Sequence, residues 1–442
     1  MRYLLYVIAI VCIAGCGVKT LKHADDQKAI DQPPPPSAAK IQEVGEGFGD
    51  LVIDGNLLTT PGNSLIKIKG GVYNNINISN ITGEHGVVTI TNNGLVRMTG
   101  DGQMRLKNLS NVVITGNGTD GISKGFLFED MKYRSIEVDG VLNNFTLQYM
   151  SFKNIGDNVF TYHYNQDYDG SEGSYSKNLK FLHNDCDNTG QFISGAGSVD
   201  GANIKGYIKN IEIAHLDFKN SPDVGTIVWL GNVEGYDIHN NTINNINTKN
   251  NNHNGIFLLN GNGKFHNNKI SNHQGNAIRA FGFTVGNEPK NVLIYNNIVF
   301  NSRKYSAFEV QSFATNIIPK RTTHINALIF NNTCGNLNLS NDWQGNVADV
   351  YNLIGGTCKV FNNLAFNLPG PHVIAGQESV LKPVAYNNLY FKTSKEAGIV
   401  DEQEFKLTPD SPARKGGVAD SLAVKDFYNH PRGVPPSIGA VE

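Results

Sequence analysis

Pairs of asparagine recur in this chain at a fixed place within a short repeating unit. Between Asn254 and Phe300 the unit reads N-G-I-F-L-L-N, K-F-H-N-N-K-I, N-A-I-R-A-F-G-F and N-V-L-I-Y-N-N-I-V-F. Two kinds of short apolar strand alternate there, and Asn or Gly fills every gap. From Asn240, successive pairs begin at steps of 27, 29, 35, 31 and 25 residues, at Asn267, Asn296, Asn331, Asn362 and Asn387.

A repeat of this kind favours a coil of parallel strands. One turn of two or three short strands cannot bury its own apolar face, so neighbouring turns must cover it. Loops of variable length at the corners explain why the step varies. Asn tolerates the left-handed backbone of a tight corner, and stacked Asn side chains can hydrogen-bond from turn to turn. No stretch after residue 50 has ten residues of helical period, so the fold class is all-β.

These strands and corners resemble the right-handed parallel β-helix proteins of the pectate-lyase-like superfamily, over residues 50 to 395. The resemblance implies a single-stranded right-handed parallel β-helix, which we place at residues 45–400. It also implies that a glycan would lie along the outer face of one sheet. A second resemblance covers L-T-P-D-S-P-A-R-K-G-G and the final I-G-A-V-E, which are similar to the closing segment of secreted bacterial β-helix proteins. We therefore expect residues 401–442 to cap the last turn and blunt its open edge, with Arg432 paired to Asp426 or Glu442.

The N-terminus indicates export and lipidation. An apolar run after Arg2 ends in I-A-G-C at Cys16 and resembles a bacterial lipoprotein signal peptide, residues 1–16. The alternative is an ordinary signal peptide or an anchor helix. Residues 17–44, which include Pro33–Pro36, read as a flexible tether. The resemblance implies a lipid anchor on Cys16 and a place at the outer membrane or cell surface.

Composition excludes some functions. Of the 442 residues, 17 % are charged, and the net charge is −2. A nucleic-acid-binding protein would be expected to carry a basic patch or stripe, so this composition argues against that function. Three cysteines of the body, Cys186, Cys334 and Cys358, form no even framework, so we interpret them as buried apolar residues.

Strand alternation predicts a stripe of outward side chains on the second strand family. If Ile227, Ile256, Ile278 and Phe308 point inward, their successors point outward, although a shift of one residue would invert this. The predicted stripe comprises Val228, Leu230, Phe257, Leu259, Arg279, Phe281, Glu309 and Gln311, with Tyr162 and Tyr351 at its ends. Because aromatic faces suit sugar rings, we expect Tyr162, Phe257, Phe281, Gln311 and Tyr351 to contact substrate.

Arg279 and Glu309 fall on adjacent turns of this stripe, about 4.8 Å apart. Arg279 is a candidate for neutralising a uronate carboxylate or moving a proton, and Glu309 for an acid, base or cation ligand. A surface salt bridge is the alternative. His253 and His273 precede strands at corners near the stripe and are candidate general bases, unless they only bond backbone.

A loop insertion carries Asp167, Asp169 and Glu172. Three acids among glycines could bind Ca²⁺, although the spacing is not that of an EF-hand and a solvated acidic loop is the alternative. Asp200 lies in a second insertion.

Motifs of the better-known β-helix enzymes are absent. The chain lacks the N-T-D, D-D, G-H-G and R-I-K set of galacturonan hydrolases, the R-x-P-x-x-R of pectate lyases and the D-P-H-D of mannuronan epimerases. We predict a surface β-helix protein that binds and cleaves an acidic polysaccharide by β-elimination. A non-catalytic glycan-binding or adhesin-like protein is the alternative. A glycoside hydrolase is a further one, with Glu309 opposite Asp200 or an acid of the 167–172 loop.

Overall fold

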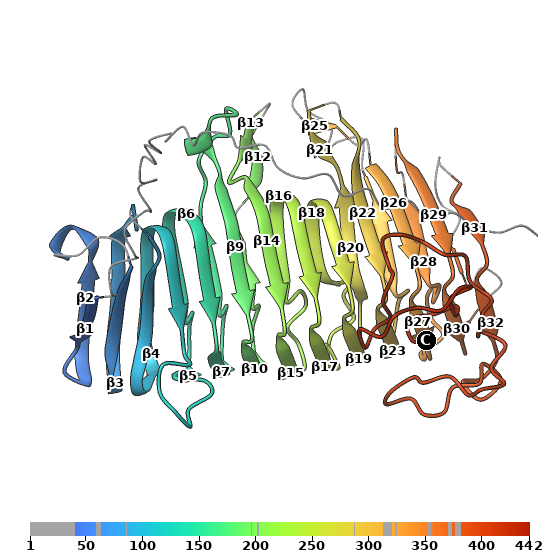
Figure 1. Cartoon of the computed structure of the whole chain (residues 1–442), viewed down its shortest axis with the longest axis horizontal. Coiled ribbons are helices and arrows are strands. Elements are labelled where there is room, and N and C mark those ends of the chain that lie inside the picture. The colour runs from blue at the N-terminus through green and yellow to red at the C-terminus, as the bar shows by residue number, and fades with distance from the viewer. Residues whose placement is uncertain are drawn as a thin grey trace, which may run out of the picture. The chain divides into compact units, whose positions relative to one another are not determined.

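Successive turns of the chain place their strands side by side in three parallel sheets along one axis (Figure 1). The computed structural model describes residues 40–442 apart from 59–62, 85, 196, 201–202, 287, 313–320, 323–324, 352, 354, 370–373 and 376–381. The fold is the right-handed parallel β-helix that the sequence predicted. Each turn passes from sheet 1 through sheet 2 to sheet 3 and then begins the next turn.

Strand bounds follow the repeat. Sheet 1 contains β5 (Phe126–Met131), β7 (Met150–Ile155), β10 (Asp185–Thr189), β15 (Asp217–Ser221), β17 (Thr242–Ile246), β19 (Lys269–His273), β23 (Ile298–Ser302), β27 (Thr333–Gly335), β30 (Leu364–Phe366) and β32 (Leu389–Phe391). Sheet 2 contains β8 (Phe160–His163), β11 (Ile193–Ser194), β20 (Asn276–Gly282), β24 (Phe308–Gln311) and β28 (Ala348–Tyr351). Sheet 3 contains β9 (Ser176–Leu182), β14 (Ile208–Ala214), β22 (Lys290–Tyr295), β26 (Ile325–Phe330), β29 (Thr357–Phe361) and β31 (Val384–Tyr386).

Three longer strands bend from sheet 2 into sheet 3. They are β6 (Ile136–Gln148), β16 (Val228–His239) and β18 (Gly255–His266). The first turns are built by β1 (Lys40–Val44), β2 (Phe48–Asp54), β3 (Ser64–Ile81) and β4 (Val88–Thr115). Two short 3₁₀ turns, η1 (Gly55–Leu57) and η2 (Glu172–Ser174), are the only helical elements among the described residues. Two antiparallel pairs leave the coil between sheets 2 and 3 (Figure 1): the hairpin of β12 (Ser198–Asp200) with β13 (Asn203–Lys205), and β21 (Thr284–Val285) with β25 (Arg321–Thr322), which come from loops of successive turns.

The Asn pairs form the corner between sheets 3 and 1, as predicted. The first Asn of each pair from Asn240 to Asn387 has a left-handed backbone, with φ between 50 and 55°. The second Asn points into the coil and donates its amide to the next turn at 2.9 to 3.1 Å. This internal ladder satisfies polar groups that would otherwise be buried without partners. It runs through Asn241, Asn268, Asn297, Asn332, Asn363 and Asn388.

Inward residues of equivalent strands stack to make a continuous core. On sheet 2 one inward row is fully buried and keeps its register over many turns. The row mixes aliphatic and aromatic side chains, and burial of each Val, Ile or Phe contributes roughly 1.5–3 kcal/mol. The row comprises Ile136, Phe160, Ile193, Val228, Phe257, Ile278, Phe308 and Ala348. The three body cysteines are free and buried, as expected.

The C-terminal segment lies along the flank of the coil, which corrects the prediction of an end cap. Apolar residues between Ala397 and Val441 cover the outer face of sheet 1 around Ile298, Phe300 and Phe366. Asn362, Asn296 and Asn267, each the first of its pair, donate to backbone carbonyls of Val418, Lys425 and Phe427 at 2.7 to 3.0 Å. We call residues 393–442 the strap. Among the described residues, the last strands β31 and β32 pair on one side only.

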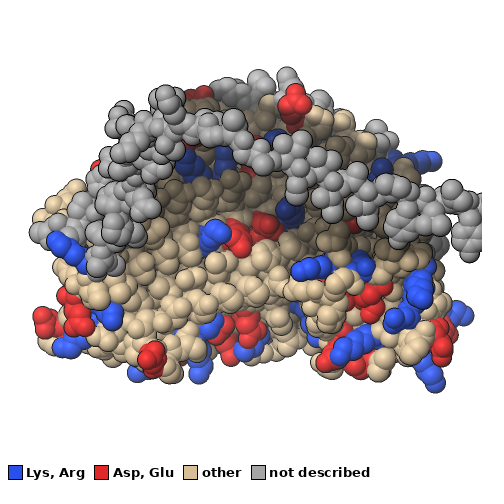
Figure 2. Space-filling view, viewed as in Figure 1, with Lys and Arg blue, Asp and Glu red and all other residues tan. Residues whose placement is uncertain are grey.

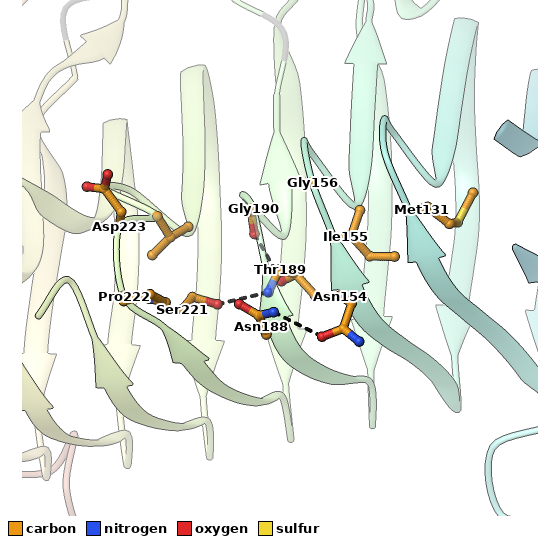
Figure 3. Close-up of a pocket in the computed structure, with 11 residues that line it drawn as sticks. Met131, Asn154, Ile155, Gly156, Asn188, Thr189, Gly190, Ser221, Pro222 and Asp223 are labelled. Carbon is orange, nitrogen blue, oxygen red and sulfur yellow. Dashed lines mark hydrogen bonds between the residues drawn. The ribbon is translucent and has the colours of Figure 1, made fainter. Parts of the chain in front are cut away.

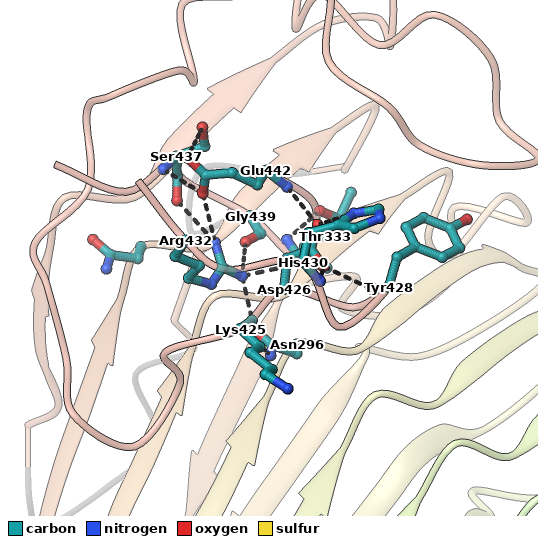
Figure 4. Close-up of polar contacts among 12 residues, drawn as sticks. Asn296, Thr333, Lys425, Asp426, Tyr428, His430, Arg432, Ser437, Gly439 and Glu442 are labelled. Carbon is teal, nitrogen blue, oxygen red and sulfur yellow. Dashed lines mark hydrogen bonds and ion pairs between the residues drawn. The ribbon is translucent and has the colours of Figure 1, made fainter. Parts of the chain in front are cut away.

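Arg432 fastens the strap, and its predicted pairing with Glu442 is present at 3.6 Å (Figure 4). Its guanidinium also donates to Asn296 Oδ1 at 2.8 Å and to the Gly439 carbonyl at 2.9 Å. Asp426 instead accepts the backbone N–H of His430 at 2.8 Å. Burial lowers the pKa of Arg432 from its ordinary value. The contact is structural.

At the other end, the β-helix begins earlier than expected. Residues 40–44, predicted as tether, form β1 and pair with Ser64–Ile68 of β3. The predicted signal peptide, the lipidation site Cys16 and residues 17–39 of the tether lie outside the described residues. No helix in the described part of the chain is long and apolar enough to cross a bilayer.

Candidate functional site

Three of the four predicted catalytic residues meet on the outer face of sheet 2. Arg279 on β20 and Glu309 on β24 pair directly in register. The guanidinium Nε lies 2.6 Å from Glu309 Oε1. His253, from the loop that precedes β18, places Nε2 3.0 Å from Glu309 Oε2. Adjacent turns and one corner loop therefore converge on a single carboxylate.

The outward side chains in this register form what we call the outer row of sheet 2. Trp229 pairs with Leu258, Leu258 with Arg279, Arg279 with Glu309, and Glu309 with Asp349. Each step is one strand spacing of about 4.8 Å. Charged residues thus occupy three consecutive turns, next to two apolar ones.

Glu309 is a buried carboxylate, with 1 % of its side chain exposed. Its Oε1 accepts from Arg279 Nε and from Gln311 Nε2. Arg279 also donates through Nη1 to the backbone carbonyl of His253 at 3.2 Å. A buried charge is tolerated only when it is paired and hydrogen-bonded, so Glu309 fixes both Arg279 and the His253 loop in place.

His253 is held in one tautomer. Its Nε2 lies 3.0 Å from Asn276 Oδ1, while the Nδ2 of Asn276 donates to the Ser306 carbonyl at 2.9 Å. Since Nε2 faces the oxygens of Asn276 and Glu309, it must carry the proton. The N–H points at Asn276, so Glu309 Oε2 has a charge contact with His253 but no aligned hydrogen bond. Among the described residues, Nδ1 has no polar partner, and its lone pair is available to accept a proton.

Two other histidines show why this arrangement is distinctive. His239 and His266, on the outer face of sheet 3, also contact carboxylates, those of Glu212 and Asp237, at 3.3 and 3.0 Å. Their Nδ1 atoms each contact the Oδ1 of the following Asn, at 2.8 and 2.9 Å. Both ring nitrogens of these residues are therefore engaged. His253 differs because it keeps one nitrogen open.

Aromatic rings surround the imidazole of His253. Tyr305 stacks on it with ring centroids 4.2 Å apart, and Trp343 lies 6.0 Å away. Lys304 places Nζ 5.5 Å from the Tyr305 ring and forms an ion pair with Asp342 at 2.9 Å. These residues come from loops on three turns at the corner between sheets 1 and 2.

Asp349 adds a second buried acid beside Glu309, and its side chain is fully enclosed. Burial raises its pKa to about 6, although hydrogen bonds from Ser306 and Asn346 oppose the shift. The Asn346 amide donates to Oδ1 at 2.6 Å. The Glu309 carboxylate raises the pKa further and His253 lowers it. The acid therefore belongs to the same electrostatic group as the candidate catalytic residues.

The structure corrects the facing of two predicted substrate contacts. Phe257 pairs with Val228 and Ile278 in the core and is fully buried. Tyr162 is 4 % exposed, and burial strongly raises its pKa. Neither can contact a polysaccharide. Phe257 was misplaced because Ile256 and Phe257 are both buried. Ile256 is buried at the corner, and the alternation of inward and outward residues begins with Phe257, one residue later than assumed. Val228, Leu230 and Leu259 are likewise inward.

The other three predicted contacts share one outward row beside the cluster. Phe281, Gln311 and Tyr351 pair in succession, after Asn260. Arg279 lies 5.5 Å from the centroid of the Phe281 ring. Phe281 and Tyr351 are partly exposed, whereas Gln311 is buried against Glu309. The binding of substrate by Phe281, Gln311 and Tyr351 therefore stays a prediction.

His273, the fourth predicted catalytic residue, does not join the site. It ends β19 on sheet 1, is 2 % exposed, and neither ring nitrogen has a hydrogen-bond partner among the described residues. Burial lowers its pKa to about 4, so it is neutral at ordinary pH. A buried imidazole of this kind cannot reach a substrate.

The acidic loop does not converge on a cation site. Asp167 faces Lys205 at 3.8 Å, and Asp169 accepts the backbone N–H of Ser171 at 2.8 Å. Glu172 accepts from Tyr175 at 2.7 Å and pairs with Lys177. No three His, Cys, Asp or Glu side chains of the described chain come together as metal ligands. The residues predicted to hold Ca²⁺ therefore do not fit it.

The acidic loop also does not supply the second carboxylate proposed for hydrolysis. Asp200 lies in the β12–β13 hairpin opposite Asn203. The loop acids are engaged as described, and none contacts Glu309 in the described structure. Glu309 and Asp349 are adjacent, but both are buried and cannot act on opposite sides of a glycosidic bond.

Two hollows elsewhere on the surface have fewer side chains that could act in catalysis than the His253, Arg279 and Glu309 cluster. One of about 370 Å³ lies at the corner between sheets 1 and 2 on earlier turns (Figure 3). Its lining is mostly Asn, Gly and small or apolar side chains, and Asp223 is its single charged group. The other, about 460 Å³ on sheet 3, contains Lys180 paired with Glu212 at 2.8 Å and Lys264 with Asp237 at 3.9 Å. Figure 2, seen from the same side as Figure 1, shows a small group of acidic and basic side chains in the middle of the face and larger groups along its lower edge and at the lower right.

Sequence reasoning missed five residues of the site. Asp349 lies in β28 (Ala348–Tyr351), from which the predicted stripe included only Tyr351. Tyr305 and Trp343 lie in corner loops, whose length varies from turn to turn and gives no register. Trp229 and Leu258 were passed over because the facing was shifted by one residue. Reading I-V-W and I-F-L as a corner residue followed by an inward one would have found both.

Comparisons with known proteins find similar chains among solved structures only. No family model matches the chain, and no curated protein matches it in sequence. Among solved structures, a PL6 family polysaccharide lyase from Pseudopedobacter saltans is 14 % identical, with a TM-score of 0.43, covering 88 % of this chain and 99 % of that one. Pectate lyase Pel9A is 13 % identical, with a TM-score of 0.36, covering 89 % and 96 %. At these identities no catalytic residue of either protein can be carried over to this chain.

Proposed function

We propose that this β-helix binds an acidic polysaccharide on the outer face of sheet 2 and cleaves it by β-elimination. The observation that supports this proposal is the pairing of an available base with a fixed cation. His253 keeps Nδ1 open, and Arg279 is anchored beside it on the buried Glu309. A uronate needs both groups, since its carboxylate must be neutralised before the neighbouring carbon gives up a proton.

In the proposed reaction, His253 Nδ1 takes the proton from the carbon next to the uronate carboxylate. The electron pair of that C–H bond forms a C=C bond, the glycosidic C–O bond breaks, and the departing oxygen takes up a proton from water, which regains it from the imidazolium. Arg279 neutralises the carboxylate through Nη2, which has no partner among the described residues. Glu309 touches no substrate. It positions Arg279 and stabilises the imidazolium, so it is a positioning residue.

A glycan-binding protein without catalysis is the second candidate. It is favoured by one observation: Arg279 already donates two hydrogen bonds within the protein, and its side chain is only 23 % exposed. A guanidinium this restrained serves well as a fixed binding group even if no proton is moved.

Location at the outer membrane or cell surface through lipid on Cys16 is part of the same proposal, supported by the I-A-G-C segment. Cys16→Ser in the full precursor is expected to release the protein from the membrane fraction. Retention of the variant in that fraction would contradict the anchor.

The test uses polygalacturonate, alginate and chondroitin sulfate, with Ca²⁺ or with a chelator. Ultraviolet absorbance reports the unsaturated product of elimination, and a reducing-end assay reports any cleavage. We expect both signals together on at least one polymer. Reducing ends without absorbance would indicate hydrolysis, and saturable binding without either would indicate the binding protein.

Arg279→Ala is the matching variant, with Lys264→Ala, which removes an ion pair on sheet 3, as its control. Arg279→Ala should abolish elimination, and circular dichroism checks that the β-helix persists. If Arg279→Ala retained both cleavage and binding, the outer face of sheet 2 would be the wrong surface.

A further inference from the structure

The chain contains two tryptophans, and both lie beside the His253, Arg279 and Glu309 cluster. Trp229 belongs to the outer row of sheet 2, two strand spacings, about 9.6 Å, before Arg279. Its side chain is partly exposed, between Ser194 and Leu258 of the neighbouring turns. Trp343 belongs to the turn of β28, at the opposite end of the cluster along the axis.

Trp343 is exposed, with 51 % of its surface accessible, but it contacts neighbouring residues. Its ring packs edge-on against Tyr305 with centroids 5.7 Å apart. Asn338 donates its amide to the Trp343 carbonyl, and the adjacent turn has left-handed Asn338 and Asn341. Tryptophan is enriched at interfaces because its ring is apolar and its N–H can reach water, so this exposed ring is a candidate ligand contact.

Charge next to these rings suits an anionic ligand. Lys304 Nζ lies 6.0 Å from the Trp343 ring centroid, and Arg279 lies between the two tryptophans along the axis. The acids nearest to Arg279, Glu309 and Asp349, are both enclosed in the protein. Lys304 is neutralised by the exposed Asp342 beside Trp343, so Arg279 is the cation that the surface between the two rings offers to an anionic ligand.

We propose that Trp229 and Trp343 are stacking platforms for two sugar units of one acidic polysaccharide chain that runs along the β-helix axis across Arg279. The ligand is then a polymer that occupies several turns rather than a single sugar. This inference rests on the substrate class of the proposed function, but it requires no cleavage. It assigns Trp229 and Trp343 to binding and leaves proton transfer to His253.

Because there are only two tryptophans, each can be observed alone. Trp229→Phe leaves Trp343 as the sole indole, and Trp343→Phe leaves Trp229. The emission of each single-tryptophan protein is titrated with polygalacturonate, alginate and chondroitin sulfate, and with neutral dextran as the uncharged polymer. We expect both emissions to change saturably, with the same midpoint, on one acidic polymer and not on dextran.

Alanine variants give the second readout. Trp229→Ala and Trp343→Ala should each raise the midpoint of binding, or KM, roughly three- to tenfold while leaving kcat nearly unchanged. Tyr390→Ala, an exposed ring on β32, is the control and should change neither. Emission changes without elimination would support these platforms while refuting the lyase. Elimination with unchanged emissions, a response from only one tryptophan, or no response to any acidic polymer would overturn the inference.

Discussion

At the scale of single residues, burial shifts the pKa values of Asp349 and His273 in opposite directions, so the two groups change stability with pH in opposite ways. Burial raises the pKa of Asp349 to about 6, above about 3.9 in an unfolded chain. Between these values the native state keeps a proton that the unfolded state releases, so this group lowers stability as pH rises from about 4 to 6. Above pH 6 the full cost, about 3 kcal/mol, remains.

His273 acts in the other direction. Burial lowers its pKa to about 4, against about 6.5 when unfolded. As pH falls through this window the unfolded state binds a proton that the native state refuses, so stability is lost toward acid. Over about pH 4 to 6 the two groups therefore offset each other.

Asp349→Asn should separate these effects. We expect the variant to be more stable than wild type by up to about 3 kcal/mol at pH 7 and equal to it near pH 4. Denaturant unfolding at a series of pH values measures this difference. Asp410→Asn, at an exposed carboxylate, is the control and should shift stability by less than about 0.5 kcal/mol. A difference for Asp349→Asn that does not vary with pH would refute the assignment.

At the scale of elements, the internal Asn ladder joins the turns at the corner between sheets 3 and 1. Asn297 donates to the Phe265 carbonyl at 2.9 Å and to Asn332 at 3.0 Å, and accepts from Asn268. Asn297→Ala removes hydrogen bonds to buried groups on the two neighbouring turns, so we expect a loss of about 3 kcal/mol in the free energy of unfolding.

Asn301→Gly is the matched control for the ladder. Asn301 is left-handed, with φ 56°, and donates to Asn272 on the outside of the coil, where water can replace the bond. Glycine accepts this backbone, so the change should stay below about 1 kcal/mol. Equal losses for the two variants in thermal unfolding would mean that the internal position of the ladder is unimportant.

The strap is the second element with a direct test. Arg432→Ala removes the donors that bind Asn296 and the carbonyls of residues 437–440, and we expect the strap to open. Loss of about 3 kcal/mol would speed amide exchange in residues 418–442 roughly 100-fold. Hydrogen exchange measures this, with the exposed Arg414→Ala as control. Unchanged protection in Arg432→Ala would show that apolar packing alone holds the strap.

At the scale of the whole molecule, the sequence predicts the fold better than the site. The Asn pairs mark the corner between sheets 3 and 1 in the sequence, because few residues other than Asn and Gly accept the left-handed backbone of this corner. The signal is strong because the corner recurs on successive turns. The pairing of Arg279 with Glu309 followed from equal positions in adjacent units. Phe257 was misplaced because Ile256 and Phe257 are both buried, and two buried residues in succession hide the point at which alternation starts.

Loops and long-range contacts explain the rest of the difference. Trp343 and Tyr305 contact His253 from corner loops. Because these loops differ in length from turn to turn, the sequence does not show which of their residues lie at equivalent positions. Residues 401–442 were expected at the end of the coil, but their contacts with Asn267 and Asn296 join positions more than 100 residues apart. Such contacts have no local sequence signal.

The most direct test of the account compares two histidines. Initial rates of unsaturated uronate formation are measured for wild type, His253→Ala and His239→Ala on the polymer that wild type cleaves. His239 contacts a carboxylate as His253 does, but on sheet 3. We predict a loss of at least about 100-fold for His253→Ala and a rate close to wild type for His239→Ala. A wild-type rate in His253→Ala, or equal losses in both variants, would contradict the placement of the site.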